Sequence, residues 1–545
     1  MYAAVVILAV AASAMSLPNG YALDDVALVV RNTRVHSLND AWRLFALPYW
    51  PPQYGASLYR PLVTVGYAVQ WALGGGAPWV FHATSVAVYA AASALVLALF
   101  RMLLPPAAAL IGAALFAVHP VHVEAVSNAV GQSELVTASA ILAAALVYLR
   151  SRRAGPPGPA AISCIAAAFA VACLAKEHGV LLPAILLVVE WLVVRGDGTR
   201  DGALRTRVRE IAPLYTILAA VGIAYAIVRT FVVGDLLGET DVIPVEGLSR
   251  AGMMLVVAPH WVRLLAWPAH LSADYSPQHV RIPDGMSAEV VLGIVVLAVL
   301  IGLFGALGSG RPETHADRSA ARLVLALAAI ALVPVSNLFY VLVVAERALF
   351  LPSVGAMLAV SAAASAALRQ AHGGRARVRA LVATGATIGV MLGAARSNLR
   401  HRVWRDDGTL FAQTVRDAPL SYRAQFFYGQ ILFARGKPAD GERHLRLAIA
   451  LNPTRSDVSP LNYLATQYRE AGLCAQALPL YEEALRRADG RPDVRFGLAS
   501  CLLAVGKADA ARRLAAEGVR RGNLKALFEE LLARSDSVRH LGQGG

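Results

Sequence analysis

Cysteine and acidic residues are scarce in this chain, and the motifs of several large enzyme classes are missing. Only four cysteines occur, with no C-x-x-C pair, so neither a disulfide framework nor a zinc site is indicated. They are Cys164, Cys173, Cys474 and Cys501. The sequence has no G-x-x-x-x-G-K-[ST] and no Rossmann glycine pattern, which disfavours an enzyme driven by ATP or a nucleotide sugar. It also lacks G-x-S-x-G and H-E-x-x-H, which argues against an esterase or a zincin.

Apolar residues are abundant instead. Hydrophobic residues make up 57% of the 545 positions, the mean hydropathy is +0.54, and several apolar stretches are long enough to cross a bilayer. These values predict a multispanning membrane protein. Met1 to Leu17 ends like a signal peptide, but it lacks the basic start of one, which favours an uncleaved first span.

The net charge of +14 comes largely from arginines in short loops between apolar segments. This pattern indicates membrane orientation and attraction to anionic lipids, and it makes nucleic acid an unexpected partner. We place about eleven spans along the chain. They lie near 1–17, 78–100, 107–118, 134–149, 160–175, 179–194, 211–233, 285–308, 321–335, 349–368 and 380–396.

Among the loops between predicted spans, alternate loops carry most of the arginines, and the positive-inside rule makes these loops cytoplasmic. The external set is then 18–77, 119–133, 176–178, 234–284, 336–348 and the region after about 397. Lys176, Glu177 and His178 interrupt one long apolar stretch. Because a charge at the bilayer centre costs roughly 2.5–3.5 kcal/mol on insertion scales, we expect a hairpin turn there. Segments 58–75 and 250–268 are typical of interfacial helices.

The C-terminal region differs from the rest in composition. From about 421 a repeat of about 34 residues appears, and its small residues fall where tetratricopeptide repeats pack their paired helices closely. The sequence therefore predicts an all-α protein with a polytopic membrane helix bundle and a C-terminal tetratricopeptide α-solenoid. We divide it into a membrane domain at 1–397, a linker at 398–420, about three repeats at 421–525 and a tail at 526–545. The repeats could hold a peptide in their concave groove or act as a spacer.

Asp24 and Asp25 are the leading candidates for acid–base chemistry. They follow Asn19-Gly20-Tyr21 at the start of the first external loop, which is rich in aromatic residues and proline. One carboxylate could act as a general base while its neighbour raises its pKa or shares a cation with it. The alternative is a turn or helix cap in a surface loop.

Further ionisable residues are predicted on the same external face. His119, His122 and Glu124 form an H-x-x-H pattern with a nearby glutamate, which is a weak signal for a divalent metal or a phosphate oxygen. Arg60, Lys176 and Arg347 are cations that could hold a phosphate, with Glu177 and Glu346 beside them in sequence. Ordinary salt bridges and helix-end polar residues would explain each of these equally well.

Taken in order, these residues resemble a known family. The matching motifs are Asp24-Asp25, Tyr59 to Leu62, Phe81-His82, Phe116 to Val126, Ala175 to Gly179 and Ala345 to Gly355. They resemble the transmembrane and tetratricopeptide-repeat proteins of the C-type glycosyltransferase superfamily, from about 20 to about 520 in this chain.

The resemblance implies a polyprenyl-phosphate-linked sugar as donor and, as in the animal members, mannose transfer to Ser or Thr of proteins. It also implies an acidic base in the first external loop, onto which Asp24 or Asp25 maps. The chain departs from the animal members in carrying about three repeats, which is fewer than theirs.

The residues themselves agree with this chemistry, because a lipid phosphate is a good leaving group and one base with cations suffices for an inverting displacement. We therefore expect an external-face glycosyltransferase in a bacterial inner membrane, with periplasmic repeats and a protein acceptor. Two alternatives stay open: a membrane scaffold for envelope proteins, and a lipid-linked glycan ligase or flippase. The sugar, the acceptor, any metal requirement and the oligomeric state are not fixed by the sequence.

Overall fold

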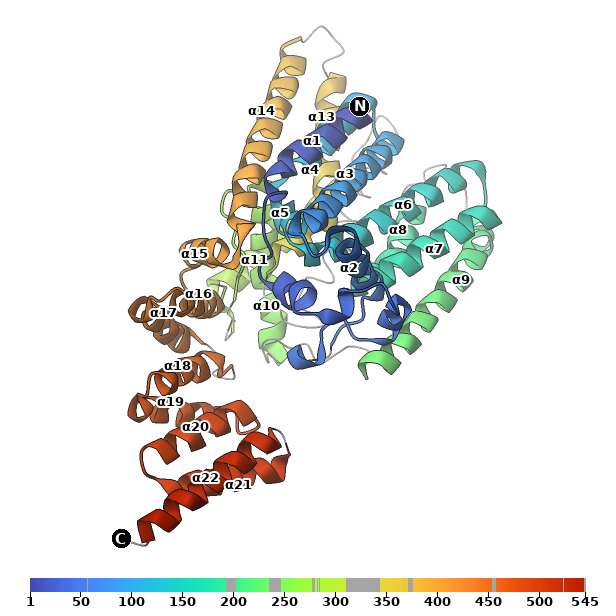
Figure 1. Cartoon of the computed structure of the whole chain (residues 1–545). Helices are drawn as coiled ribbons and strands as arrows, with labels where there is room; N and C mark the ends of the chain where they lie inside the picture. Colours follow the sequence, from blue (N-terminus) through green and yellow to red (C-terminus); the bar gives the residue numbers. More distant parts are fainter. Residues whose placement is uncertain are drawn as a thin grey trace. The chain divides into compact units, whose positions relative to one another are not determined.

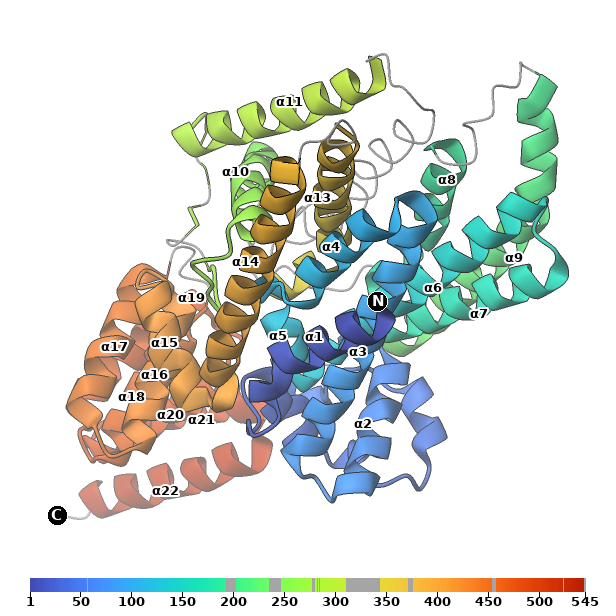
Figure 2. The same cartoon turned by 90° about the horizontal axis from the view of Figure 1, so that it is seen from above.

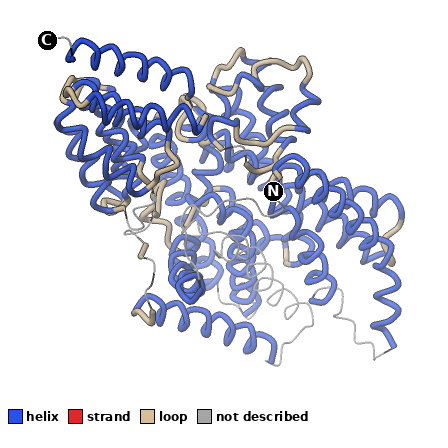
Figure 3. Tube along the Cα trace, turned by 90° about the horizontal axis from the view of Figure 1, so that it is seen from below, coloured by secondary structure: helices blue, strands red, loops and turns tan. Residues whose placement is uncertain are grey.

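In the computed structural model, the regular secondary structure of the described residues is helical, and loops connect the helices (Figure 3). It describes residues 1–55, 57–192, 202–234, 247–276, 280–281, 283, 285–309, 344–370, 376–452, 457–522 and 524–543. No strand occurs among these residues. The predicted all-α class is confirmed. The chain forms two compact units, which we name the membrane unit (Met1–Ala273 and Ile282–Gln413) and the repeat unit (Asp274–Arg281 and Thr414–Gly545).

The membrane unit is built from long apolar helices (Figures 1 and 2). They are α1 (Tyr2–Ser13), α3 (Pro78–Leu103), α4 (Pro106–Ala117), α6 (Gln132–Ala154), α7 (Pro159–Ala175), α8 (Leu182–Leu192), α9 (Gly202–Val233), α10 (Gly247–Ala266), α11 (Ala288–Ser309), α13 (Phe350–Gln370) and α14 (Ala376–His401). Proline opens α3, α4 and α7, where its fixed φ suits a helix start and its missing N–H has no partner to lose.

The helices α3, α4, α6 and α13 share one apolar core. Phe100, Phe116 and Phe350 are among its fully buried side chains. Helices α4 and α13 approach closely at Gly112, where an added Cβ would lie 1.8 Å from Ser361 Oγ and 2.7 Å from the Met357 carbonyl oxygen. Glycine is therefore required by backbone proximity at this contact.

Five helices in the described part of the chain are long and apolar enough to span a membrane. They include α3, α9 and α13, and the bent pair Pro106–Ala117 and Pro120–Ser127 raises the number to six. Shorter apolar helices cover Tyr2–Ser16, Pro159–Ala175, Gly252–Ala266 and Ala288–Leu300. The predicted span at 321–335 lies outside the described residues. A multi-pass membrane protein is thus supported, whereas the number of about eleven spans is not confirmed.

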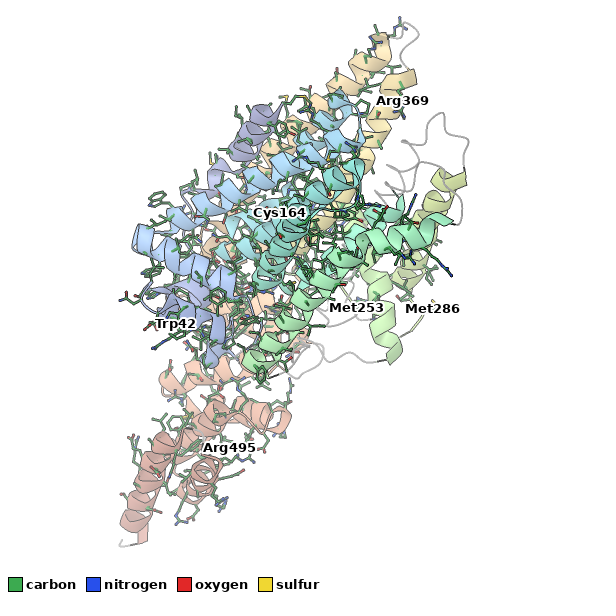
Figure 4. The ribbon with its side chains drawn as sticks, turned by 90° about the vertical axis from the view of Figure 1, so that its right-hand side faces the viewer. Trp42, Cys164, Met253, Met286, Arg369 and Arg495 are labelled. Atoms are coloured by element: carbon green, nitrogen blue, oxygen red, sulfur yellow. A yellow bond between two sulfur atoms is a disulfide. The ribbon has the colours of Figure 1, made fainter. Side chains whose placement is uncertain are left out.

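Residues 18–77, predicted as the first external loop, form a small folded layer. It contains the short helices η2 (Val26–Val30) and η4 (Ala41–Ala46), followed by α2 (Pro61–Gly74). Leu28, Val35, Tyr49, Tyr67 and Phe81 belong to its apolar core. This packing gives the segment that follows Asp24 and Asp25 a fixed support. One of its aromatic residues, Trp42, lies at the surface and is 69% exposed (Figure 4).

The repeat unit contains three helix pairs followed by a further helix. The pairs are α16 (Tyr422–Ala434) with α17 (Pro438–Leu451), α18 (Ser459–Glu470) with α19 (Cys474–Arg487), and α20 (Pro492–Ala504) with α21 (Ala508–Arg521). The predicted tail is largely helix α22 (Lys525–Gln543), and the predicted linker contains helix α15 (Asp407–Asp417).

Small residues allow the paired helices to approach. In the first pair, an added Cβ on Gly429 would meet Leu445 at 2.9 Å, and one on Gly441 would meet Phe433 at 2.5 Å and the Gly429 carbonyl at 2.9 Å. A glycine at 441, where this repeat usually carries alanine, therefore follows from the contact with Gly429 and Phe433.

One sequence-based expectation about cysteine was wrong. Cys474 and Cys501 form a disulfide that joins α19 to α20, with 5.0 Å between their Cα atoms. The two residues are 27 positions apart, so no local motif could reveal the pair. Cys164 and Cys173 are free.

Candidate active site

Asp25 is fully buried and serves as an anchor. Its Oδ2 accepts a hydrogen bond from the Ala129 N–H at 3.0 Å, and its Oδ1 accepts one from Val130 N–H at 3.0 Å. Both N–H groups lie just before α6 begins. Burial raises the pKa of Asp25 to about 7, although the two backbone hydrogen bonds oppose that rise and nearby Asp24 adds to it. Asp25 therefore fixes the first loop to the start of α6.

Asp24 occupies a different environment from its neighbour. Its side chain is 25% exposed, and its Oδ2 lies 3.9 Å from Nη2 of Arg347. Arg347 is held in turn by Glu124, to which it donates from Nη1 at 2.8 Å and from its backbone N–H at 2.9 Å. Three segments that are distant in sequence thus place two carboxylates around one guanidinium, and Asp24 is the carboxylate that solvent can reach.

The turn that presents Asp24 is pinned by residues near the end of α14. The Leu23 N–H donates to Oδ1 of Asp407 at 2.6 Å, and Leu23 adopts a left-handed φ of 58°. Asn19 donates its side-chain N–H to the carbonyl of His401 at 2.8 Å, and the Gly20 N–H donates to the Arg405 carbonyl at 2.8 Å. Sequence reasoning missed Asp407, because nothing near position 407 signals contact with a loop almost 400 residues earlier.

Arg60 and Glu177 form a bidentate pair beside this centre. Arg60 donates from Nε at 3.1 Å and from Nη2 at 2.8 Å, and its guanidinium lies over the Tyr49 ring at 5.1 Å. Burial alone would raise the pKa of Glu177, but the charge and hydrogen bonds of Arg60 outweigh it and lower the pKa to about 2. Arg229 of α9, which the sequence did not single out, lies 3.7 Å from Glu177.

Lys176 pairs with Glu134 at the start of α6, and His178 Nε2 lies 3.2 Å from the other oxygen of Glu134. Burial lowers the pKa of Lys176 well below its ordinary value, and the positive charges of Arg60 and Arg347 lower it further. That mutual influence shows that the three predicted cations share one neighbourhood. The paired residues around these cations form a group that we call the outer charged cluster. Its members are Asp24, Arg60, Glu124, Glu134, Lys176, Glu177, Arg229 and Arg347.

His119 and His122, which the sequence proposed as phosphate or metal contacts, lie inside the helix bundle. The ring of His122 lies between the Tyr89 hydroxyl at 2.9 Å and the Ser353 hydroxyl at 2.8 Å. The ring of His119 contacts the Leu265 carbonyl through Nε2 at 3.1 Å. Both side chains are buried, and these hydrogen bonds join segments that are distant in sequence.

Glu346 likewise has an internal contact, since its Oε1 accepts the N–H of Ser272 at 2.6 Å and its side chain is buried. The sequence left a divalent metal open. In the described part of the chain, no group of three or more His, Cys, Asp or Glu side chains is arranged to hold a metal ion.

Comparison with known proteins points to one family. Human "Protein O-mannosyl-transferase TMTC3" is 27% identical over 376 residues, which cover 64% of this chain and 40% of that protein. Human "Protein O-mannosyl-transferase TMTC4" is 27% identical over 485 residues, which cover 80% of this chain and 64% of the relative. A Tetratricopeptide repeat family model matches residues 468–534.

The resemblance to the transmembrane and tetratricopeptide-repeat proteins is confirmed. A segment of 144 residues reaches 34% identity with "Protein O-mannosyl-transferase Tmtc2" of Drosophila melanogaster, covering 25% of this chain and 15% of that protein. The chain spans about two fifths of the length of the TMTC3 relatives that it matches.

Proposed function

We propose that this protein is an integral membrane glycosyltransferase that transfers mannose from a polyprenyl-phosphate carrier to a Ser or Thr hydroxyl of a protein. The relatives are named protein O-mannosyl-transferases, which supports the reaction class and the protein acceptor. The observation that carries the proposal is the position of Asp24, a solvent-accessible carboxylate beside Arg347 in a cluster with Arg60 and Lys176.

The proposed reaction is a single displacement. Asp24 takes the proton of the acceptor hydroxyl while the hydroxyl oxygen attacks the anomeric carbon, and the bond from that carbon to the phosphate oxygen breaks. The lipid phosphate leaves with both electrons of that bond. Attack from the face opposite the phosphate inverts the configuration of the anomeric carbon, and no second acid is needed.

The charges of the cluster suit this step. Each of its carboxylates lies beside an arginine or beside Lys176. When Asp24 accepts the proton it becomes neutral, and the net charge of the cluster rises by one. The phosphate gains one negative charge in the same step. Once Asp24 is neutral, the positive charge of Arg347 is less compensated, so it stabilises the new negative charge on the leaving phosphate more strongly.

Arg347 is the cation best placed to respond, because Glu124 accepts one hydrogen bond from its guanidinium and one from its backbone N–H, while Asp24 lies beside it. Arg60 and Lys176 would contribute through the field, with their side chains held by Glu177 and Glu134. Oriented, paired cations need little reorganisation when the charge appears.

We further propose that the site faces the outside of a bacterial inner membrane, with the repeats periplasmic and available to hold the acceptor. The disulfide between Cys474 and Cys501 supports this placement of the repeats, because disulfides persist mainly in oxidising compartments. The match of a repeat model to 468–534 supports a peptide-binding role.

The decisive experiment is transfer from polyprenyl-phosphate mannose to a Ser/Thr-containing peptide by the purified full-length protein. Asp24→Asn should lower the rate by about 100-fold or more, as expected for loss of a general base. Asp40→Asn is the matched control, because Asp40 lies in the same loop but is exposed and pairs with Arg43 at 3.7 Å. A transfer rate in Asp24→Asn equal to that of the wild-type protein would overturn the assignment of the base. A product that retains the anomeric configuration would overturn the single displacement.

A further inference from the structure

The backbone just before Asp24 has a strained conformation. Leu23 adopts a φ of 58°, in the left-handed region that residues with a side chain rarely occupy. A leucine stays there only where the surrounding contacts enforce it. Because the backbone angles of Leu23 set the direction in which the chain enters Asp24, the Asp24 side chain keeps its place only while this conformation is held.

Asp407, the first residue of α15, supplies a polar contact at this position. Its Oδ1 accepts the N–H of Leu23 at 2.6 Å, and both residues belong to the membrane unit. Burial raises the pKa of Asp407 above its ordinary value, the hydrogen bond from Leu23 opposes that rise, and the charge of Asp24 adds to it. The carboxylate of Asp407 therefore lies close enough to Asp24 to act on the same turn.

The neighbouring aspartate performs the local task that would otherwise explain Asp407. An aspartate at a helix start commonly caps the free backbone N–H groups there. At the start of α15 this role falls to Asp406, whose Oδ1 accepts the Thr409 N–H at 2.8 Å and the Thr409 hydroxyl at 3.1 Å. Asp407 directs its carboxylate instead to a residue 384 positions earlier. The contact with Leu23 thus serves the turn and not the helix.

Apolar packing holds the same turn by its side chains. Ala22 is buried in a cluster with Val123, Trp404 and Leu410, and Leu23 packs against this cluster. The packing fixes the direction of the Leu23 Cβ, whereas the hydrogen bond to Asp407 fixes the peptide plane before Leu23. Because φ is the rotation about the bond between that plane and Cα, the two contacts together hold the left-handed value.

We propose that Asp407 is a positioning residue that keeps Leu23 left-handed and thereby holds the Asp24 carboxylate beside Arg347. It acts through the backbone and touches no substrate. Without the hydrogen bond, Leu23 relaxes to a negative φ by a rotation of roughly 120°. This rotation carries Asp24 away from its place 3.9 Å from the Arg347 guanidinium. The role in transfer rests on the proposed function, whereas the hold on the turn can be measured without activity.

The first test compares replacements at Asp407 in the transfer assay with the full-length protein. Asp407→Ala removes the acceptor, so kcat should fall about 10- to 100-fold with KM almost unchanged, as for a misplaced catalytic group. Asp407→Asn keeps an oxygen that can accept the Leu23 N–H, so kcat should stay within about threefold of the wild-type value. Asp406→Ala is the matched control and should behave like Asp407→Asn, because its carboxylate caps α15.

Equal losses of kcat in Asp407→Asn and Asp407→Ala would assign the effect to the charge of Asp407 and would overturn positioning by the hydrogen bond. A rise in KM that accounts for the whole loss in Asp407→Ala would also overturn it, because substrate binding and not the placement of the base would then have changed.

The second test adds Leu23→Gly to form a double-mutant cycle. Glycine populates positive φ about as readily as negative φ, so in the Asp407→Ala background Leu23→Gly should raise kcat by about threefold or more. In the wild-type background the same change only loosens the turn, and kcat should fall. If Leu23→Gly lowers kcat by the same factor in both backgrounds, the backbone of Leu23 is not the route and the proposal is wrong.

The third test is amide hydrogen exchange in detergent, resolved to single amides. In Asp407→Ala, the amides of Leu23 and Asp24 should exchange about tenfold faster or more, and in Asp407→Asn they should stay near the wild-type rate. The amides of Ala129 and Val130, which donate to Asp25, should not change in either variant. Faster exchange at all four amides in Asp407→Ala would mean that the whole loop has come loose, and would overturn a role confined to the turn.

The exchange measurement also separates this proposal from the proposed function. If the wild-type protein transfers no sugar, or if Asp24→Asn leaves transfer unchanged, the proposed function fails. Exchange at Leu23 and Asp24 in the two Asp407 variants then still decides whether Asp407 holds the turn.

Discussion

Glu134 and Arg152 lie on the same helix, α6, about 27 Å apart at 1.5 Å per residue, and each belongs to a buried ionic group. Glu134 is part of the outer charged cluster near the helix start. At the other end, Arg152 donates to both oxygens of Glu190, at 2.9 Å and 2.7 Å, and lies 3.0 Å from Glu210. The Tyr148 hydroxyl also donates to Glu190 at 2.8 Å.

The two groups differ in access to solvent more than in pairing. The side chains of Arg152 and Glu190 are each 5% exposed, whereas those of Asp24 and Arg347 are 25% and 23% exposed. The Arg152 group ties α6, α8 and α9 together. Its arginine and Glu190 are buried, and its Glu210 is 30% exposed. Pairing therefore identifies both groups as well organised, and the accessible cation Arg347 beside an accessible carboxylate distinguishes the outer one.

The largest expected effect separates the two arginines. Arg152→Met should lower the free energy of unfolding by about 3–5 kcal/mol, because it leaves Glu190 as a buried charge without its main partner. Arg347→Met should lower the free energy of unfolding less. Glu124 keeps its hydrogen bond from the backbone N–H of residue 347, and the side chain of Arg347 is 23% exposed. Denaturant unfolding in detergent measures both values.

Transfer activity per folded molecule should show the reverse order, with Arg347→Met strongly impaired and Arg152→Met close to wild type. Equal losses of stability in the two variants would remove the distinction drawn here between the two ends of α6.

The second prediction concerns the repeat unit and the compartment in which its disulfide forms. Cys501→Ser should lower the stability of the repeat unit by about 2–4 kcal/mol, because the 27-residue loop is no longer closed in the unfolded chain. Cys173→Ser, at a buried free cysteine, is the control for removing a thiol. In whole cells, Cys474 and Cys501 should react with a thiol reagent only after reduction; reaction without reductant would count against an oxidising location.

The smallest expected effect separates Asp25 from Asp24. Asp25→Asn should destabilise the protein by about 1–3 kcal/mol, because an amide NH2 group cannot accept the second of the two backbone N–H groups. The pKa of Asp25 is raised from 3.8 to about 7 in the folded state, so its stabilising contribution is full below about pH 4 and is lost as the pH rises to 7.

Melting temperatures between pH 4 and pH 8 should show this decline in the wild-type protein and not in Asp25→Asn. A decline of equal size in both proteins would assign the titration to another group.

The features that rest on local pattern were predictable. Apolar runs, the charged interruption at Lys176 and the spacing of small residues in the repeats all follow from short stretches of sequence. The structure ends α7 at Ala175 and starts α8 at Leu182, on either side of that interruption. The pairs Arg347 with Glu124 and Lys176 with Glu134 were not predictable, because each joins residues on separate helices.

The sequence by itself determined the chemical types: an apolar chain for the membrane, small residues at the repeat contacts, and a set of acids and cations outside the spans. Only the tertiary structure decided their roles. It buried Asp25 on the backbone of Ala129 and Val130, left Asp24 open beside Arg347, and turned His119 and His122 into packing contacts. The reason is physical: charge and hydrogen-bonding capacity belong to a side chain, whereas burial and the identity of its partner depend on segments that meet only in the folded chain.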